Sequence, residues 1–324
     1  MLSLKEGEPL AKSLDGKTTI YYTASKKIPA ILESCPLDHL SRELLYKIKK
    51  KYRLKNSFFK SLVRAYSKKS DTFTCSANNI AEELACSELE KHCIWHMKNV
   101  YNKDELDLVP WLNLEDSQKV ASHVHICASS SSGKSFWAAQ LILANVAKEL
   151  QKHVTIYILI SNPTDENWVS FKKSYAGQVV IIDSRKLQLP IGLMSIQKGS
   201  ILVVDDAESN TREVQQLLSD LERVVIIKGR KHASKYMGTV LLSIRHDAFC
   251  GQKTKYHSNI GRIVVFPSVN RHLATKILKN KVGFSQKEVN EALSFVPPGR
   301  YSFLYIQHNP APGFLCTKNG VRLL

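Results

Sequence analysis

Several features that mark other protein classes are absent from this sequence. No run of about 18 residues is both apolar and free of charge, so there is no candidate transmembrane helix. The opening residues, MLSLKEGEPL, lack the apolar core of a secretory signal peptide. The seven cysteines lack the regular spacing of a secreted disulfide framework, and neither repeats nor low-complexity tracts occur. We therefore expect a folded intracellular protein with no membrane span.

Acidic residues are scarce relative to basic ones, and this imbalance favours a polyanionic partner. The 324 residues include 46 Lys and Arg against 29 Asp and Glu, which gives a formal charge of +17. Basic proteins bind nucleic acids by neutralising phosphates and releasing counterions. The hydrophobic content of 44% is ordinary for a globular protein and allows one large or two modest domains.

The pattern of the chain changes near residue 116. Residues 1–115 contain no strand–helix alternation and are predicted to form a mostly helical, basic N-terminal region. Residues 116–324 alternate short β-branched runs with helix-length segments, which is typical of an α/β fold with a mostly parallel sheet flanked by helices. The predicted strands cover residues 120–127, 154–160, 179–182, 201–204, 240–243 and 263–266. Helices are predicted at 271–281 and 285–295, and the segments PPGRYSFLYIQ and GFLC predict a terminal β-hairpin.

A loop of small residues joins an apolar strand to an amphipathic helix in VHICASSSSGKSFWAAQ. This is the context of a phosphate-binding loop, in which backbone N–H groups and a helix N-terminus surround the β-phosphate. We predict that Lys134 reaches the β- and γ-phosphates and that the Ser135 hydroxyl binds Mg²⁺. Ala128 replaces the usual first glycine, which predicts a distorted loop entrance with binding retained. The predicted nucleotide-binding residues are Ala128, Ser129, Ser130, Ser131, Ser132, Gly133, Lys134, Ser135 and Phe136.

Two adjacent carboxylates follow another apolar strand in GSILVVDDAES. The carboxyl ends of parallel strands form the edge where α/β sheets bind ligands, so we expect this pair beside the loop. Asp205 is predicted to hold Mg²⁺ through water, and Asp206 to polarise the attacking water as general base. Glu208 is the second candidate for the base. The alternative is that the acids only cap the strand or begin the helix predicted at 210–222.

Three segments resemble the FtsK–HerA superfamily of DNA-pumping ATPases, in particular its viral genome-packaging branch in poxviruses and other large DNA viruses. They are ASSSSGKS, ILVVDD and IIKGRKHASKYMGTVLLSIRHD, and SNIGRIVVF resembles the strand that closes the family core. The resemblance implies a RecA-like sheet, ATP and Mg²⁺ as cofactors, and a homo-oligomeric ring that threads double-stranded DNA. It also implies viral capsid proteins as partners, and a location in the host cell, in viral factories of the cytoplasm or in the nucleus, and in the virion.

The resemblance also assigns roles to individual residues beyond the loop and the acidic pair. Ser243 falls near the end of a sensor strand, where the family usually has Gln next and this chain has Ile244. Arg245 follows and is the candidate substitute. A catalytic arginine donated by the neighbouring subunit is implied, because such an arginine stabilises charge in the transition state. Its candidates are Arg230, Arg245 and Arg262. His257 stands where many relatives have an Arg before the last core strand.

The densest positive charge lies in residues 47–69, KIKKKYRLKNSFFKSLVRAYSKK, which contain ten Lys and Arg and no acid. Leu54, Phe58, Leu62 and Tyr66 recur at four-residue spacing, which indicates that this row faces a core. We therefore expect contacts with phosphates rather than stacking on bases. The alternatives are a solvated helix face or a nuclear-import signal. The predicted DNA-binding residues are Lys49, Lys50, Lys51, Arg53, Arg230 and Lys231.

Two weaker patterns have simpler structural interpretations. Asp165 and Glu166 follow the second predicted strand and are candidates for nucleotide contacts, but they also match the signal for a helix start. Four residues on one predicted helix suggest zinc, yet no CxxC pair anchors such a site, and buried thiols explain the cysteines as well. These four are Cys86, His92, Cys93 and His96.

The leading hypothesis is a Mg²⁺-dependent ATPase that converts hydrolysis into translocation of double-stranded DNA, filling a viral capsid. A second hypothesis is a nucleotide-dependent DNA-binding or scaffold protein with a weakened loop, because Ala128 and Ile244 depart from the family pattern. A third is a helicase-like P-loop ATPase. Composition does not distinguish ATP from GTP.

Overall fold

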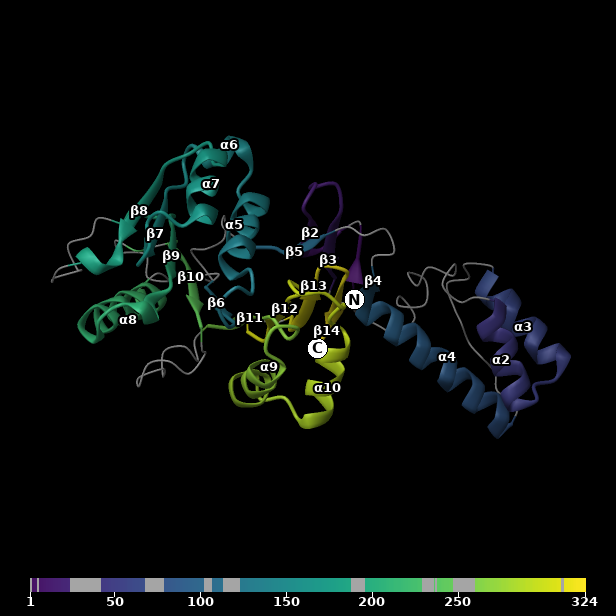
Figure 1. The fold of residues 1–324 in the computed structure, drawn as a ribbon. Helices are drawn as coiled ribbons and strands as arrows, with labels where there is room; N and C mark the ends of the chain where they lie inside the picture. Colours follow the sequence, from purple (N-terminus) through teal and green to yellow (C-terminus); the bar gives the residue numbers. More distant parts are fainter. Residues whose placement is uncertain are drawn as a thin grey trace. The chain divides into compact units, whose positions relative to one another are not determined.

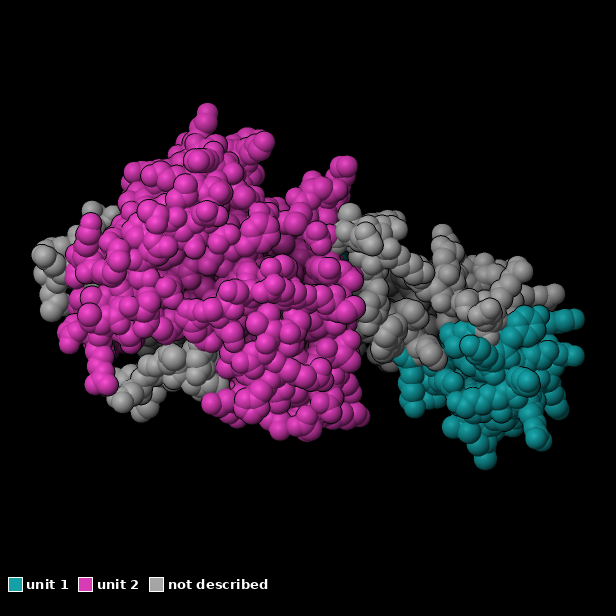
Figure 2. Space-filling view, viewed as in Figure 1, with its two compact units in different colours: residues 1–9, 20–101, 323 teal, residues 10–19, 102–322, 324 magenta. Residues whose placement is uncertain are grey.

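The protein divides into two compact units, coloured separately in Figure 2. The computed structural model in Figure 1 describes residues 2–4, 6–23, 42–67, 79–101, 107–112, 123–187, 196–228, 236, 238–246, 260–309 and 312–324. Unit 1 comprises residues 1–9, 20–101 and 323, and unit 2 comprises residues 10–19, 102–322 and 324. The domain boundary at residue 115 stays a prediction. Among the described helices, none is both long and apolar enough to cross a membrane.

Unit 1 contains a small helical core. Its helices are α2 (Arg42–Tyr52), α3 (Asn56–Ser67) and α4 (Ile80–Lys98), and its strands β1 (Leu2–Ser3) and β3 (Thr19–Tyr22) pair antiparallel. The core is formed by the buried side chains of Leu45, Ile48, Leu54, Phe59, Ala85 and Leu89. Leu54 is buried and Phe58 packs against the same core, as their spacing predicts; the side chains of Leu62 and Tyr66 lie outside the described residues. The short strands near the N-terminus carry no pattern from which they could be predicted.

Nine described strands form the sheet at the centre of unit 2. The strand order is β14-β13-β12-β11-β6-β10-β9-β7-β8. The strands from β11 to β8 run parallel, whereas β12 and β13 continue the sheet antiparallel as the predicted hairpin. Their bounds are β6 (Val124–Cys127), β7 (Ile156–Ile160), β8 (Val179–Asp183), β9 (Ile201–Asp205), β10 (Val240–Arg245), β11 (Arg262–Val265), β12 (Leu304–Gln307), β13 (Phe314–Thr317) and β14 (Gly320–Leu323). The buried β-branched runs of the sequence thus form the parallel strands.

Helices cover both faces of this sheet (Figure 1). Helix α8 (Arg212–Lys228) packs Leu218, Leu221 and Val225 on Leu202 and Val204 of β9. Helices α9 (Arg271–Ile277) and α10 (Gln286–Ser294), with the π-helical turn Leu278–Val282 between them, cover the same face over β11 and β12. On the opposite face lie α5 (Lys134–Asn145) and α7 (Glu166–Ser174), and the short α6 (Lys148–Gln151) follows α5.

The alternation of side chains along β9 positions one of the two predicted acids. Leu202 and Val204 face α8, so Val203 and Asp205 face the opposite side of the sheet, toward α5 and α7. Asp205 is the last residue of β9, at the edge where the other parallel strands also end. The strand period therefore directs this carboxylate toward the start of α5.

A short two-stranded ribbon, formed by β2 and β5, belongs mainly to unit 2, although its residues fall in the N-terminal region predicted to be mostly helical. Residues 11–13 of β2 (Glu8–Ser13) pair antiparallel with β5 (Leu108–Pro110). Asn145 of α5 ties this ribbon to the core of unit 2, because its side chain donates to the Pro110 carbonyl at 3.0 Å and accepts from the Leu112 N–H at 2.8 Å. Asn145 is buried, so these bonds are shielded from water.

Candidate functional site

A cleft of about 1000 Å³ opens in unit 2 where the parallel strands end. It is lined by residues 130–135 of the predicted phosphate loop, by Asp205 and Asp206 after β9, and by His246 after β10. The loop and the acidic pair lie far apart in the sequence, and the structure brings them together as expected. Strand β10 lies between the loop strand β6 and the acidic strand β9.

Two residues of the loop adopt left-handed backbone conformations. Gly133 has φ of 86°, and a Cβ atom there would lie 3.1 Å from the Tyr301 ring, so both the turn and the close approach favour glycine. Ser131 has φ of 59°. Ala128 has no such conformation; its N–H donates to the Arg245 carbonyl at 3.1 Å and continues the β6–β10 ladder. In this structure an alanine therefore fits the first position of the motif without left-handed strain.

Lys134 is folded back onto the loop. Its Nζ donates to the carbonyl oxygens of Ala128 at 2.8 Å and Ser129 at 2.9 Å, and only 7% of the residue is exposed. Burial lowers the pKa of Lys134, and the nearby charge of Asp205 opposes this shift. The cation is thus held inside the loop by two neutral acceptors, which anionic phosphate oxygens would replace with a stronger interaction.

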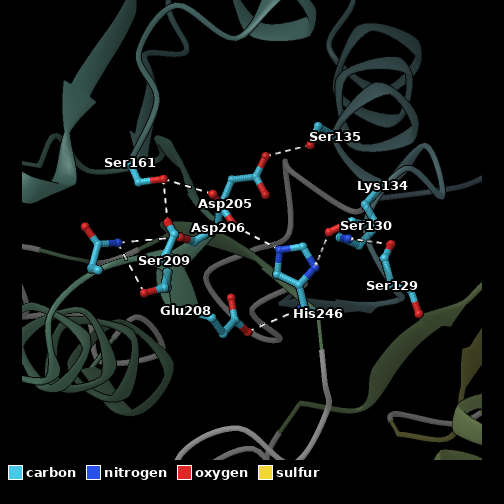
Figure 3. A network of polar contacts seen from close by, with 12 residues as sticks. Ser129, Ser130, Lys134, Ser135, Ser161, Asp205, Asp206, Glu208, Ser209 and His246 are labelled. Atoms are coloured by element: carbon cyan, nitrogen blue, oxygen red, sulfur yellow. Dashed lines mark hydrogen bonds and ion pairs between the residues drawn. The ribbon is translucent and has the colours of Figure 1, made fainter.

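Asp205 is the buried member of the acidic pair. Its Oδ2 accepts hydrogen bonds from the Ser135 hydroxyl at 2.7 Å and from the Trp168 indole N–H at 2.8 Å (Figure 3 shows the Ser135 bond). Burial raises the pKa of Asp205, and these two donors act in the opposite direction. Trp168 of α7 is fully buried, and no sequence pattern connects it with the site. Ser135 and Asp205 together present the hard oxygen ligands that Mg²⁺ prefers.

Asp206 has a different environment and an unusual backbone. It follows β9 with φ of 53°, a left-handed conformation that is rare for residues other than glycine. Its side chain accepts from the Ser161 hydroxyl at 2.9 Å and contacts Nε2 of His246 at 2.8 Å. Burial alone would raise the pKa of Asp206, but the hydrogen bonds from His246, Ser161 and Ser209 outweigh it and lower the pKa. The carboxylate is therefore kept ionised, as a proton acceptor must be.

His246 connects the loop to the acidic pair, and it was not among the residues predicted from the sequence. Nδ1 lies 3.3 Å from the Ser130 hydroxyl while Nε2 contacts Asp206 (Figure 3). The backbone N–H of His246 donates to Glu208 Oε1 at 3.2 Å, so Glu208 holds the turn after β10. Asp206, Glu208 and His246 place ligand atoms within 4.8 Å of one another, a set that could also hold a metal ion. The available signal was the position of His246, one residue beyond the end of β10 and three residues beyond the predicted strand 240–243.

The arginines proposed for catalysis are engaged within their own chain where the structure describes them. Arg245 is 8% exposed and forms an ion pair of 2.8 Å with the fully buried Glu222 of α8, which also accepts from the Ser243 hydroxyl. Arg262 is 6% exposed and donates to Gln307 at 2.9 Å. These arrangements argue against Arg245 or Arg262 as an arginine donated to a neighbouring subunit. Arg230 and His257 lie outside the described residues.

Asp165 and Glu166 have the simpler of their two predicted roles. The Asp165 side chain accepts from the N–H groups of Asn167 at 3.0 Å and Trp168 at 3.4 Å, so it caps α7. Glu166 is exposed in the first turn, where a negative charge favours the helix dipole. The Asp165 cap also fixes the start of α7, the helix from which Trp168 donates its hydrogen bond to Asp205.

The architecture of unit 2 agrees with the predicted fold class. The sheet is mostly parallel and lies between two helical layers, as predicted, whereas the position of β10 between the loop strand and the acidic strand was not predicted. The fold is that of a RecA-like P-loop NTPase. No protein-family model and no curated protein matches the chain.

Solved structures similar to the chain include viral genome-packaging enzymes. The DNA-packaging ATPase B204 from Sulfolobus turreted icosahedral virus is 15% identical with a TM-score of 0.38, over 61% of this chain and 97% of that one. The genome packaging NTPase B204 from Sulfolobus turreted icosahedral virus 2, in complex with AMPPCP, is 16% identical with a TM-score of 0.37, over 61% and 97%. EssC (ATPases 2 and 3) from Geobacillus thermodenitrificans is 12% identical with a TM-score of 0.34, over 67% and 40%. These neighbours include the viral genome-packaging branch that the sequence motifs resemble.

The basic residues predicted to bind DNA are only partly available in unit 1. Lys50 and Arg53 are exposed, whereas Lys49 is half-buried with Nζ 4.8 Å from the centre of the Phe59 ring. Lys51 is exposed and forms an ion pair of 2.6 Å with Glu88, and the hydrogen bond to Glu88 raises the pKa of Lys51. The other two predicted contacts, Arg230 and Lys231, lie outside the described residues.

The zinc prediction receives no support from the described residues. Cys86 is half-buried on α4 and takes part in a disulfide, so its thiolate is not available as a ligand. The side chains of His92, Cys93 and His96 lie outside the described part of the chain. The thiols of Cys127 and Cys316, in contrast, are free and buried, as expected for core cysteines.

The buried ion pair beneath β10 yields a prediction on stability. Glu222→Gln should lower the free energy of unfolding by about 3 kcal/mol, because it leaves the Arg245 guanidinium buried without its counter-charge. Urea unfolding followed by tryptophan fluorescence measures the change. The matched control is Glu291→Gln, which breaks the more exposed pair with Arg322 and should change the free energy by less than about 1 kcal/mol. Equal changes in the two variants would contradict a special role for the buried pair.

Proposed function

We propose that the protein is a Mg²⁺-dependent ATPase that converts ATP hydrolysis into translocation of double-stranded DNA. One observation carries the proposal: a phosphate loop, a serine–carboxylate pair and a second, ionised carboxylate converge in a single cleft. Each of these parts has a function in phosphoryl transfer to water, which depends on positioning and charge stabilisation. The site is therefore complete for binding a nucleoside triphosphate and for activating water.

The residues of the loop suit the charge of a triphosphate. Lys134 would exchange its two carbonyl acceptors for phosphate oxygens, and Ser129 to Gly133 would offer backbone N–H groups at the N-terminus of α5. Ser135 and Asp205 would hold Mg²⁺, since their oxygens already lie 2.7 Å apart. Bound Mg²⁺ would supply charge neutralisation for the phosphates.

The two acids are proposed to have separate roles because their surroundings differ. Asp205 is 4% exposed, and both of its described hydrogen bonds converge on one oxygen, which suits a ligand fixed in place. The side chain of Asp206 is 35% exposed, lines the cleft and is kept ionised, which suits a base that accepts a proton from water. His246 would orient Asp206 and sense the loop through Ser130, two residues beyond Ile244, where the family usually has the polar sensor Gln.

The DNA substrate and the biological setting are proposed from the resemblance and the charge. Unit 1 exposes Lys50, Lys51 and Arg53, which would neutralise phosphates without regard to sequence. The proposal includes a homo-oligomeric ring, packaging of a viral genome, capsid proteins as partners and a site of action in the infected cell or the virion.

A nucleotide-dependent DNA-binding or scaffold protein is the second candidate function. The observation that favours it is the engagement of Arg245 and Arg262 within their own chain, which leaves a catalytic arginine to be supplied from elsewhere. Such a protein would bind Mg²⁺ and ATP with normal affinity and turn over slowly even with duplex DNA.

Removal of the loop lysine is the first test. Lys134→Ala should reduce the rate of ATP hydrolysis by about 10²-fold or more, because it deletes the positive charge that the loop brings to the phosphates. Steady-state phosphate release with and without duplex DNA measures it. Lys152→Ala removes an exposed lysine of the same unit and should leave the rate unchanged. Normal turnover by Lys134→Ala would exclude the proposed loop, and slow turnover by the unaltered protein would favour the scaffold.

Substitution of each acid separates ligand from base. Asp206→Asn should bind Mg²⁺ and ATP normally but hydrolyse about 10²-fold or more slowly, since an amide accepts no proton. Asp205→Asn should instead weaken the metal-dependent part of ATP binding, since it removes a charge beside Ser135. Calorimetric titration of ATP with and without Mg²⁺, paired with single-turnover hydrolysis, distinguishes the two effects. Identical behaviour of the two variants would remove the division of roles.

Salt dependence tests the DNA-binding role of unit 1. Replacing Lys49, Lys50, Lys51 and Arg53 with Gln should lower the slope of log K against log salt by about 0.9 for each lysine or arginine that neutralises a phosphate. Affinity should fall to a similar extent on unrelated duplexes, measured by fluorescence anisotropy. The matched control replaces four exposed lysines of unit 2, Lys148, Lys152, Lys172 and Lys173, with Gln. An unchanged slope in the first variant would mean that this segment is a solvated face or an import signal.

A further inference from the structure

Large apolar side chains of unit 2 are exposed together in the cleft of the phosphate loop. Tyr301 is 60% exposed, Phe136 is 58% exposed and Leu14 is 41% exposed, and all three line the cleft. Exposed apolar groups that gather at one concave site indicate a ligand surface more strongly than single exposed groups do. None of these side chains has a role in binding phosphates, so the cleft contains more than the phosphate site.

The Tyr301 ring is held beside the phosphate loop by its own segment. Gly299 and Ser302 close a turn through a 3.2 Å backbone hydrogen bond, and the Ser268 hydroxyl donates to the Arg300 carbonyl at 2.8 Å. Phe303, two residues on, packs on Trp137 of α5 with ring centres 5.1 Å apart. The ring edge of Tyr301 approaches Gly133 closely. The ring is thus presented in place rather than on a free loop.

The N-terminal ribbon supplies the apolar side of the same cleft. Leu14, Leu108 and Val109 line it, and the Leu14 N–H donates to the Asp107 carbonyl at 2.9 Å. Asn145 ties this ribbon to α5, the helix that begins with the phosphate-binding Lys134. The ribbon therefore has a fixed position relative to the loop, and both belong to unit 2.

Polar groups suited to a ligand accompany these apolar side chains. The indole N–H of Trp137 and the hydroxyl of Ser302 are buried and have no hydrogen-bond partner among the described residues, and both residues line the cleft. Buried donors without partners are uncommon in folded proteins. The guanidinium of Arg300 lies 5.6 Å from the centre of the Tyr301 ring and adds a planar cation to the same wall.

We propose that this wall is a nucleobase subsite, in which the base of a nucleoside triphosphate stacks on Tyr301 and Phe136 while its phosphates bind the loop. The order of residues in α5 supports a base placed next to the phosphates, because Phe136 directly follows Lys134 and Ser135, the proposed phosphate and metal ligands. Aromatic rings stack on any of the nucleobases, and the Arg300 guanidinium would add a cation–π contact with the base. The inference rests on the proposed nucleotide site and extends it from the phosphates to the base.

The test compares a ligand that has a base with one that has none. Calorimetry with Mg²⁺ measures binding of the non-hydrolysable ATP analogue AMPPCP and of inorganic tripolyphosphate to the full chain. The unaltered protein should bind AMPPCP more tightly than tripolyphosphate. Tyr301→Ala and Phe136→Ala should each weaken AMPPCP binding by about tenfold and leave tripolyphosphate binding unchanged, because each removes only stacking surface. Tyr301→Phe keeps the ring and should keep the preference.

Controls separate failure of this inference from failure of the proposed function. Tyr46 is 59% exposed in unit 1, so Tyr46→Ala is a matched substitution that should leave both affinities unchanged. If the unaltered protein bound neither ligand, the proposed function would fall and the subsite with it. Equal affinity of the unaltered protein for the two ligands, or an unchanged preference in both alanine variants, would overturn the subsite and leave the phosphate loop intact. A change in oligomer size of Tyr301→Ala by light scattering, with its preference intact, would assign the ring to a subunit contact instead.

Discussion

The hydrogen bond from Ser135 to Asp205 connects parts of the sheet that are not neighbours. Ser135 follows strand β6 through the phosphate loop, whereas Asp205 ends β9, and β10 separates the two strands. The bond is possible only because the parallel strands end at one edge and because the alternation along β9 directs Asp205 toward α5. Trp168 adds a second donor to the same oxygen and shields it from water. The loop, the proposed metal ligands and the proposed base all take their positions from this arrangement.

Strand β10 carries a second network that lies on the opposite face of the sheet. The Ser243 hydroxyl donates to Glu222 of α8, and Arg245 forms a buried ion pair with the same carboxylate. These contacts fix β10 to α8 on the face of the sheet opposite the cleft. The next residue after β10 is His246, which contacts Ser130 of the loop and Asp206 of the acidic pair. A displacement at this strand end would therefore reach the loop, Asp206 and α8 together, and it is a physical route by which the proposed nucleotide site would be coupled to α8.

The local signals in the sequence were sufficient for the strands, the loop and the acidic pair. Each predicted strand is a short, mainly apolar run, fully buried in all but β8, and the loop combines small residues with Lys134 between a strand and a helix. His246, Trp168 and Glu222 were missed because their roles depend on contacts 21 to 116 residues away in the chain. The pairing of residues 11–13 with 108–110 was missed for the same reason, since an antiparallel pair of distant segments leaves no local pattern.

The left-handed backbone of Asp206 lowers the stability of the turn at the same position where the proposed function requires a carboxylate. For a residue with a Cβ atom this conformation costs roughly 1 kcal/mol or more, whereas a glycine would adopt it without strain. Glycine is therefore the residue that the turn itself would select, and it has no carboxylate. Under the proposed function, random drift toward a more stable glycine turn would remove the base while leaving the fold and the loop in place. An inactive relative of this protein could thus be recognised by its residue at this one position, even where every other motif is intact.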